Sequence, residues 1–415
     1  MIGDERPPHL MDPPAAMPAG EPLSGPPRTA VDGPAGRIPR YRKLAFGIAL
    51  AATLAGFVEV GSLVFFKVFR DRFTFADPSA YVVTPDHLAL LAKAYDPDLG
   101  WAPRYPTPHG ERPTPRTFQR PWMMAFGDSF THCDEVADGE TWEVFLAERT
   151  GTNVYNFGVG GFGTDQAYLR YRQTAGELRT DVVSLGFTLE SINRVVNVYR
   201  KFYWIRTGIP LTKPRFRLED GRLALVRNPL QKPEDIEKLT DPAFVDRIGR
   251  GDYWYSRASL PILSFPHARL LFDPRIWRQA LGRRAERETD ARPFEDLWQD
   301  APTRALLLAI LDAFVIDATA AGSRPVLLLF PNRPDVEALM RGRQAPGRTH
   351  FLQHCRDRGY ACFDGVASFA GALADVPDRS AYYRVGTHLS PQGNELLARE
   401  LYGFLRSRGL VPPSG

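Results

Sequence analysis

The chain has little cysteine and no grouping of cysteines that suits a metal. Its 415 residues include only Cys133, Cys355 and Cys362. Three are too few for a disulfide scaffold, and none has the paired CxxC spacing of a structural zinc site. Cys355 and Cys362 could form a disulfide in an oxidising compartment, but buried free thiols are the favoured interpretation. We therefore expect no metal, and nothing in the sequence indicates a cofactor.

Charge of one sign does not dominate any long segment. The net charge is +4, from 52 Lys and Arg against 48 Asp and Glu. These residues are spread along the chain rather than gathered into a basic stripe, so nucleic acid is not an expected partner. With 44% hydrophobic residues, the chain can bury a sizeable core in one large domain or two ordinary ones.

The first 40 residues lack a periodic apolar pattern and contain ten prolines. Such a composition cannot bury enough surface to offset chain entropy. We predict that residues 1–42 form a disordered, Pro-rich cytoplasmic tail. An apolar run follows at residues 43–67, which is about long enough to cross a bilayer as a helix at 1.5 Å per residue.

This apolar run predicts a transmembrane signal anchor. Glu59 interrupts it, but it lies toward the C-terminal third, where a charge costs less than at the bilayer centre. A cleaved signal peptide and a buried helix of a soluble domain are the alternatives. Basic residues precede and follow the run, and their balance favours a cytoplasmic N-terminus. In a bacterium the chain would cross the inner membrane once, with its main domain in the periplasm.

A lead-in at residues 68–120 precedes a main domain at 121–410. Short apolar strands alternate there with amphipathic helices, which predicts an α/β fold with a central parallel sheet between two layers of helices. The expected strands are 122–126, 153–157, 181–187, 324–330 and 361–364; the expected helices are 141–149, 165–175, 305–321, 349–358 and a last helix from 391. An aromatic-rich insertion at about 195–300 interrupts the alternation, and either packs ordinarily or caps the site.

A serine follows the first of these strands, at the sheet edge where α/β proteins bind ligands. Ser129 lies in the turn Gly-Asp-Ser-Phe at residues 127–130. A serine hydroxyl needs a neighbouring base, because it is almost fully protonated at neutral pH. His388 precedes the last helix and can return to the same edge. Ser129 is therefore the candidate nucleophile and His388 its base, and the Cys133 thiol is expected to line their pocket.

A glycine-rich run follows the second strand, between Asn156 and Thr164. Glycines there let a backbone N–H approach a developing oxyanion. A dinucleotide-binding phosphate loop is the rival interpretation. It is disfavoured because the run follows the second strand and no acidic strand end comes at the distance that ribose binding requires.

Three blocks in this order resemble the GDSL/SGNH hydrolase family. They are Phe-Gly-Asp-Ser-Phe-Thr at 126–131, Asn-Phe-Gly-Val-Gly-Gly-Phe-Gly-Thr-Asp-Gln at 156–166, and His-Leu-Ser-Pro-Gln-Gly-Asn at 388–394. The resemblance covers residues 122–410 apart from the insertion. It implies a flavodoxin-like SGNH hydrolase fold.

The resemblance also implies roles for single residues. Ser129 corresponds to the family's nucleophile and His388 to its catalytic histidine. The amides of Ser129 and Gly161 correspond to oxyanion donors, and Asp128 has a supporting role beside the nucleophile.

The sequence departs from the family in two places. The family's side-chain oxyanion donor, an asparagine in Gly-x-Asn-Asp after the third strand, is missing, and Asn193 or the Ser191 hydroxyl is the candidate for its role. The family's triad aspartate lies three residues before the histidine, where this chain has Val385. A backbone carbonyl, or Asp378 from the preceding loop, is left to orient His388.

The resemblance implies a serine esterase, or a related acyltransferase, that acts on an acyl group such as O-acetyl. Together with the anchor, it suggests an acylated carbohydrate or lipid of the cell envelope as substrate. One alternative is a catalytically inactive SGNH-fold module that binds a glycan or a protein. The other is a lipase or thioesterase.

Overall fold

The computed structural model of the chain describes residues 39–69, 73, 81–115, 117–118, 121–256, 261, 263–274, 276–277, 294–384 and 387–412. Most of the predicted tail, residues 1–42, therefore lies outside the described residues. The chain divides into two units, Met1–Phe57 and Val58–Gly415.

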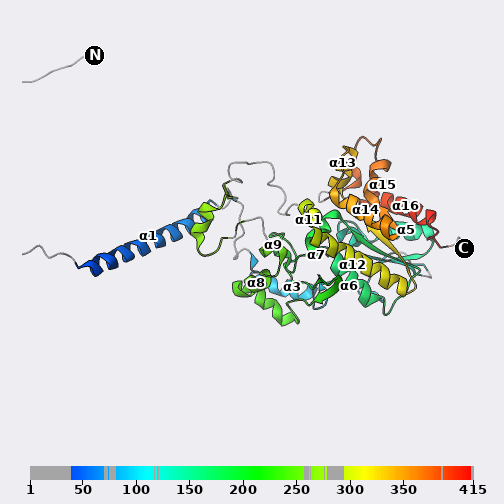
Figure 1. Ribbon diagram of the computed structural model, residues 1–415. Coiled ribbons are helices and arrows are strands. Elements are labelled where there is room, and N and C mark those ends of the chain that lie inside the picture. Colours follow the sequence, from blue (N-terminus) through cyan, green and yellow to red (C-terminus); the bar gives the residue numbers. More distant parts are fainter. Residues whose placement is uncertain are drawn as a thin grey trace, which may run out of the picture. The chain divides into compact units, whose positions relative to one another are not determined.

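One long helix, α1 (Arg40–Val68), coincides with the predicted span (Figure 1). Its most apolar stretch of 18 residues has a mean hydropathy of 2.0, and 6% of that stretch is buried. The helix is thus long and apolar enough to cross a membrane, and its exposure differs from that of a soluble protein's core helix. A signal sequence near the N-terminus can meet the same criteria of length and composition.

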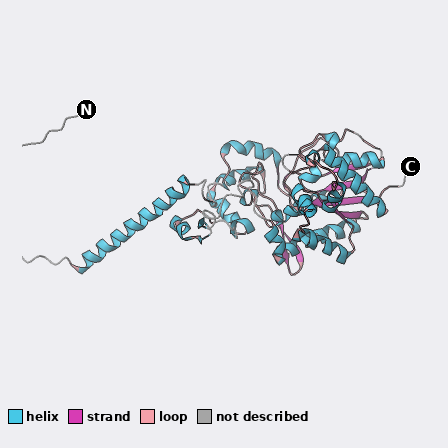
Figure 2. Cartoon of the chain, turned by 90° about the horizontal axis from the view of Figure 1, so that it is seen from above, coloured by secondary structure: helices cyan, strands magenta, loops and turns pink. Residues whose placement is uncertain are grey.

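The main domain is built on one five-stranded sheet (Figure 2). The strands lie in the order β4 (Asn153–Asn156), β3 (Pro121–Phe126), β5 (Val182–Phe187), β8 (Arg324–Leu329) and β9 (Cys362–Asp364). Every pair is parallel. Numbered in chain order, the strands lie in the order 2-1-3-4-5. The connection after β3 therefore runs toward one edge of the sheet, and the connection after β5 runs toward the other. The gap between β3 and β5 is the topological switch point, and α/β proteins bind ligands beyond the carboxyl ends of the strands at such a point.

Helices cover both faces of the sheet. One face carries α6 (Thr164–Thr174), α12 (Ala301–Ala320) and α14 (Pro346–Arg358), and the other carries α5 (Trp142–Thr150), α15 (Gly365–Ala372) and α16 (Pro391–Ser407). The predicted three-layer α/β fold is therefore confirmed. Every expected strand and helix is present, whereas α15 and α13 (Arg333–Met340) were not expected.

Shorter elements complete the described chain. They are η2 (Pro85–His87), α3 (Leu88–Ala94), β1 (Tyr95–Asp96), β2 (Gly100–Trp101), α4 (Ser129–His132), η3 (Asp138–Glu140), η4 (Leu189–Ser191), α7 (Ile192–Val195), η5 (Arg200–Phe202), β6 (Arg215–Glu219), β7 (Arg222–Val226), η6 (Pro233–Thr240), α8 (Pro242–Gly249), α9 (Tyr253–Ser256), η7 (His267–Phe272), α11 (Glu295–Gln299) and η8 (Ser380–Tyr382).

The inserted region packs against the sheet domain through buried contacts. Its hairpin, β6 and β7, lies against α12. Lys213, just before β6, forms an ion pair with Asp165 on α6, and both side chains are at most 2% exposed. Burial raises the pKa of Asp165 and lowers that of Lys213, and each shift is opposed by the attraction of the partner. Tyr203, Trp254 and Tyr255 are buried, so ordinary packing accounts for these three aromatic residues. Other large aromatic residues of the insertion are exposed, namely Trp204, Phe265, Phe272 and Trp277.

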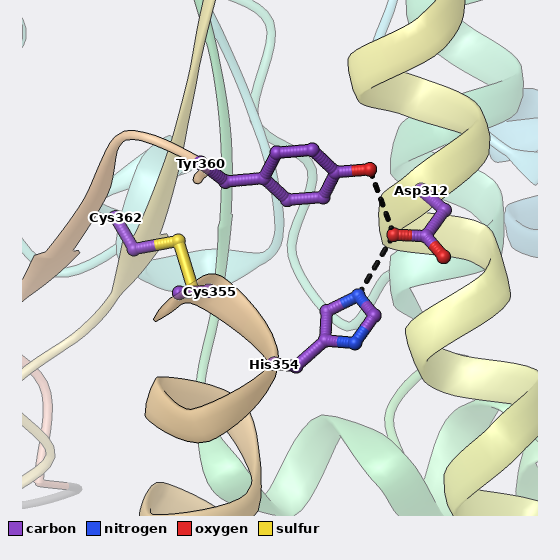
Figure 3. Close-up of a disulfide and its surroundings, with 5 residues drawn as sticks. All are labelled: Asp312, His354, Cys355, Tyr360 and Cys362. Carbon is purple, nitrogen blue, oxygen red and sulfur yellow. Dashed lines mark hydrogen bonds and ion pairs between the residues drawn. A yellow bond between two sulfur atoms is a disulfide. The ribbon is translucent and has the colours of Figure 1, made fainter. Parts of the chain in front are cut away.

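The preference for free thiols at Cys355 and Cys362 is wrong, because the two form a disulfide (Figure 3). The bond joins α14 to the start of β9, and the two Cα atoms are 6.2 Å apart, within the range that a disulfide requires. Beside it, His354 and Tyr360 both point to the Asp312 carboxylate of α12, at 2.7 and 2.9 Å. The separation of seven residues between Cys355 and Cys362 does not show that the end of α14 and the start of β9 lie this close together.

Replacing Lys213 with Met should destabilise the fold strongly, because it leaves the Asp165 carboxylate buried without its partner. We expect the free energy of unfolding to fall by about 3–5 kcal/mol, measured by urea unfolding of the chain in detergent. The double variant Lys213→Met/Asp165→Asn should recover part of this loss. The matched control is Arg250→Met, which breaks the exposed pair with Asp246 and should change little; an equal loss in both single variants would contradict the prediction.

Candidate active site

Ser129 is held at the end of the central strand β3. The chain leaves β3 at Phe126, and α4 begins at Ser129 after one tight turn. Asp128 caps this short helix, since its Oδ1 accepts a hydrogen bond from the Phe130 amide at 3.0 Å. The helix ends after one turn because Cys133 takes a left-handed conformation, with φ of 61°. Ser129 therefore lies at the carboxyl edge of the sheet, beside the switch point.

The Asp128 carboxylate connects the nucleophile turn to two other segments. Its Oδ2 accepts hydrogen bonds from the Ser191 hydroxyl at 3.1 Å and from Arg194 Nη1 at 3.2 Å. Burial raises the pKa of Asp128, and the Arg194 charge opposes that shift. The same Arg194 Nη1 donates to the carbonyl of Phe162 at 2.8 Å. One buried guanidinium thus joins the nucleophile turn to the glycine run.

His388 approaches Ser129 from the far end of the chain. Its Nε2 lies 2.8 Å from Ser129 Oγ. The following residues fix the position of the histidine: Leu389 forms a bridge to Tyr383, and Ser390 caps α16 through the Gly393 amide at 3.1 Å. The predicted nucleophile and base are therefore within hydrogen-bonding distance, in the geometry that base-assisted attack requires.

The carboxylate beside His388 belongs to Glu135, which the sequence did not single out. Glu135 Oε1 lies 2.7 Å from His388 Nδ1. Asp378, the acid considered from sequence, is instead turned to the Ser380 amide at 2.9 Å and is exposed. Val385 lies outside the described residues. The structure thus differs from the expectation: the carboxylate beside His388 comes from the loop after α4, six residues beyond Ser129.

A buried arginine from the lead-in holds the loop that carries Glu135. Arg112 donates to the carbonyls of His132, of Cys133 at 2.7 Å and of Val136 at 2.7 Å. These carbonyls lie at the C-terminal end of α4 and just beyond it, where helix carbonyls lack partners within the helix. Because the contacts bracket residue 135 on both sides, Arg112 fixes the backbone from which Glu135 reaches His388. The sequence offered no indication of this role.

A second histidine lies one turn from the nucleophile but is already engaged. His132 Nε2 lies 2.6 Å from the Tyr105 hydroxyl, and its Nδ1 forms an ion pair with Asp134. Burial alone would raise the pKa of Asp134, but the contact with His132 and the charges of His388 and Arg112 together lower that pKa. With both ring nitrogens occupied, His132 is not placed to act as a base toward Ser129.

A small pocket opens at Ser129, with an empty volume of about 190 Å³ that includes adjoining solvent. Its lining residues are Ser129, Phe130, Cys133, Glu135, His388, Leu389 and Asn394. Cys133 does line the pocket, as expected. Burial raises the pKa of its thiol well above the ordinary value, so the sulfur stays protonated and is a poor rival nucleophile. No described residue of the insertion lines this pocket, so a cap over it is not seen in the described part of the chain.

The glycine run packs directly against the nucleophile helix. Gly158, Gly160 and Gly163 do have the GxGxxG spacing of a dinucleotide-binding loop, but the space beside them is filled by protein. A Cβ at Gly158 would overlap the backbone of α4 at His132, and one at Gly161, where φ is +79°, would overlap the Arg200 guanidinium. The glycines are therefore explained by close packing rather than by a phosphate.

Gly161 lies in this run, and its carbonyl accepts a hydrogen bond from Arg200 Nη1 at 2.5 Å. Within the described residues, neither the Gly161 amide nor the Ser129 amide has a hydrogen-bond acceptor. Of these two residues, Ser129 lines the pocket and Gly161 does not.

The other two residues suggested for the oxyanion are placed differently. The Ser191 hydroxyl is engaged by Asp128, as described above, and also lies 3.2 Å from the Thr188 hydroxyl. Asn193 is fully buried, its carbonyl accepts from Trp254 Nε1 at 2.9 Å, and its side-chain amide has no partner among the described residues. No hydrogen bond joins Asn193 to the Ser129 turn in that part of the chain.

No family model matches the chain, and no curated protein matches it. Solved structures do. A member of the lipolytic protein G-D-S-L family from Veillonella parvula DSM 2008 is 9% identical, with 68% of this chain and 96% of that chain covered and a TM-score of 0.34. A catalytic mutant of an acetylxylan esterase from Geobacillus stearothermophilus is 13% identical, with 72% and 99% covered and a TM-score of 0.35. At these scores the likenesses carry no argument about activity, which depends on the site itself.

Proposed function

We propose that this chain is a serine esterase that removes or transfers a short acyl group. Ser129 is the nucleophile, His388 the general base and Glu135 the acid that orients the imidazole. The observation that supports this most directly is the continuous array from Ser129 Oγ to His388 Nε2 at 2.8 Å, and from His388 Nδ1 to Glu135 at 2.7 Å. Three groups in this order form the arrangement that activates a serine hydroxyl.

The reaction follows from this arrangement. As Ser129 Oγ attacks the ester carbonyl, His388 Nε2 takes the hydroxyl proton, and the carbonyl oxygen becomes an oxyanion. Collapse of this intermediate breaks the ester bond, and the departing alcohol takes the proton from His388. Water or a sugar hydroxyl then attacks the acyl-serine with His388 again as base, which gives hydrolysis or transfer.

The free amides of Ser129 and Gly161 are the proposed oxyanion donors. Backbone donors that are already oriented contribute about 2.7–4 kcal/mol each to barrier lowering in such sites. Arg194 and Arg200 position them, because each guanidinium binds a carbonyl of the glycine run. Ser191 acts through Asp128 in this scheme. Asn193, the sequence candidate for a side-chain donor, keeps that role only as a prediction.

The pocket favours a short acyl group such as acetyl over a long chain. It is a small recess, because its empty volume of about 190 Å³ already includes adjoining solvent. An acylated carbohydrate fits a site of this kind, since the alcohol portion can remain outside the pocket. A lipase or thioesterase would need a longer apolar channel for its acyl chain.

We also propose that α1 anchors the chain in the inner membrane and that the main domain faces the periplasm. The disulfide between Cys355 and Cys362 supports a periplasmic location of the main domain, because disulfides persist in oxidising compartments and are rare in the cytosol. An ester of the cell envelope, on a glycan or a lipid headgroup, would then be within reach of the site.

Replacing Ser129 with Ala should abolish hydrolysis of p-nitrophenyl acetate by the detergent-solubilised chain, because it removes the attacking oxygen. A serine-directed fluorophosphonate should label the wild type and not this variant. The matched control is Ser407→Ala at the exposed end of α16, which should leave both readouts unchanged. Equal rates and no labelling in wild type and Ser129→Ala would instead favour an inactive module that binds a glycan or protein. Faster turnover of octanoate than of acetate esters would favour a lipase or thioesterase.

Replacing Glu135 with Gln should lower kcat by about 10²–10⁴-fold, because the imidazole loses the carboxylate that orients it and stabilises its charged form. KM for a small acetate ester should change much less. The comparison variant is Asp378→Asn, which removes the acid suggested by sequence and should leave kcat at the wild-type value. The assignment would be reversed if Asp378→Asn were impaired and Glu135→Gln were not.

A further inference from the structure

Glu59, the acid within the apolar helix α1, is bound by a segment of the insertion. Its carboxylate accepts hydrogen bonds from the backbone amides of His267 and, at 3.0 Å, of Ala268, and His267 Nδ1 lies 2.7 Å away. These donors open the short helix η7 (His267–Phe272), so Glu59 caps that helix from another part of the chain. A carboxylate within a membrane span requires such partners.

Apolar packing continues this contact along the last turns of α1. Phe66 on α1 forms a buried cluster with Leu263, Leu270 and Ile276, and Figure 1 shows the segment beside the C-terminal end of the helix. We call residues 263–274, 276 and 277 the clamp segment. Because Glu59 precedes Phe66 by seven residues, the contact extends over about 10 Å of helix at 1.5 Å per residue. The clamp segment therefore follows the outer part of the proposed span.

The outer surface of the clamp segment carries two large apolar side chains that are mostly exposed and a third that is partly exposed. Phe265 and Phe272 are 77% and 81% exposed, and Trp277 is 38% exposed. The Trp277 ring lies 5.8 Å from that of Phe73, beyond the end of α1, which is the level of the membrane–water interface in the proposed anchor. Tryptophan is enriched at that level.

We propose that the clamp segment is a second membrane contact, which inserts into the outer leaflet beside α1. Phe265 and Phe272 enter the acyl region, Trp277 lies among the headgroups, and the hydrogen bonds from η7 satisfy Glu59 within the leaflet. The partner is the lipid bilayer, because the clamp segment packs against α1. The most apolar stretch of that helix is only 6% buried. This inference rests on the proposed anchor and is independent of the proposed esterase chemistry.

Spin labels on the full-length chain in lipid vesicles test the proposal. Single cysteines are introduced as Phe272→Cys in the clamp segment, Phe57→Cys in α1, and Ile316→Cys on α12 as the exposed control. The native Cys133 is buried and the other two cysteines are paired. We expect the labels at 272 and 57 to collide preferentially with dissolved oxygen, and the label at 316 to collide preferentially with a water-soluble nickel chelate.

The possible results separate the inference from the anchor. If the label at 272 is as accessible to the nickel chelate as the label at 316, while the label at 57 is protected, the second membrane contact is contradicted and the anchor is still supported. If the labels at 57 and 272 are both accessible to the nickel chelate, the proposed anchor is contradicted, and so is the inference that depends on it. Hydrolysis of p-nitrophenyl acetate by the same samples reports on the esterase proposal separately.

Glu59→Leu tests the cap itself. It keeps α1 apolar but removes the acceptors for His267 and Ala268, so the label at 272 should become several-fold more accessible to nickel. Glu59→Gln retains one acceptor oxygen. In this variant, the nickel accessibility of the label at 272 should lie between the values for Glu59→Leu and for the chain with Glu59. An unchanged value at 272 in Glu59→Leu would overturn the role of Glu59 in holding the clamp segment.

Discussion

The buried Asp128 carboxylate is the group on which the geometry of the candidate site depends. It cannot stay ionised at 3% exposure without donors, and its donors come from three directions. The Phe130 amide starts the nucleophile helix, the Ser191 hydroxyl follows β5, and Arg194 also binds the glycine run. Satisfying one charge thus sets the relative positions of nucleophile, switch point and proposed oxyanion loop.

The proposed acid and the proposed nucleophile belong to one short segment, and this makes the candidate site more local than the sequence suggested. Glu135 and Ser129 are joined by α4, whose end is held by Arg112. Of the three residues in the proposed triad, only His388 comes from a distant part of the chain, and Ser390 and the β-bridge between Leu389 and Tyr383 fix its approach. Variation in the loop before the histidine, where this chain has Val385, therefore need not affect the orientation of the imidazole.

The sequence predicted the features that follow from periodicity and from motif order. The strands and helices of the sheet domain and the approach of Ser129 to His388 belong to this group. Glu135 could not be found in this way, because its position depends on the left-handed turn at Cys133 and on Arg112 from a lead-in that had no readable pattern. The disulfide and the binding of Glu59 by η7 also depend on contacts between segments that are far apart in sequence or on helix ends, which periodicity does not report.

In the described part of the chain, the insertion holds other segments in place through polar contacts and does not cover the pocket at Ser129. Near its start, Arg200 binds the carbonyl of Gly161, and Lys213 is paired with Asp165 just beyond the glycine run. Further along, His267 binds Glu59. One continuous insertion therefore contacts both the proposed oxyanion loop and the proposed membrane span. Its buried polar contacts are directional, and losing either partner leaves a charge or a backbone group unsatisfied. Among the described residues of the insertion, no aromatic side chain lines the pocket at Ser129.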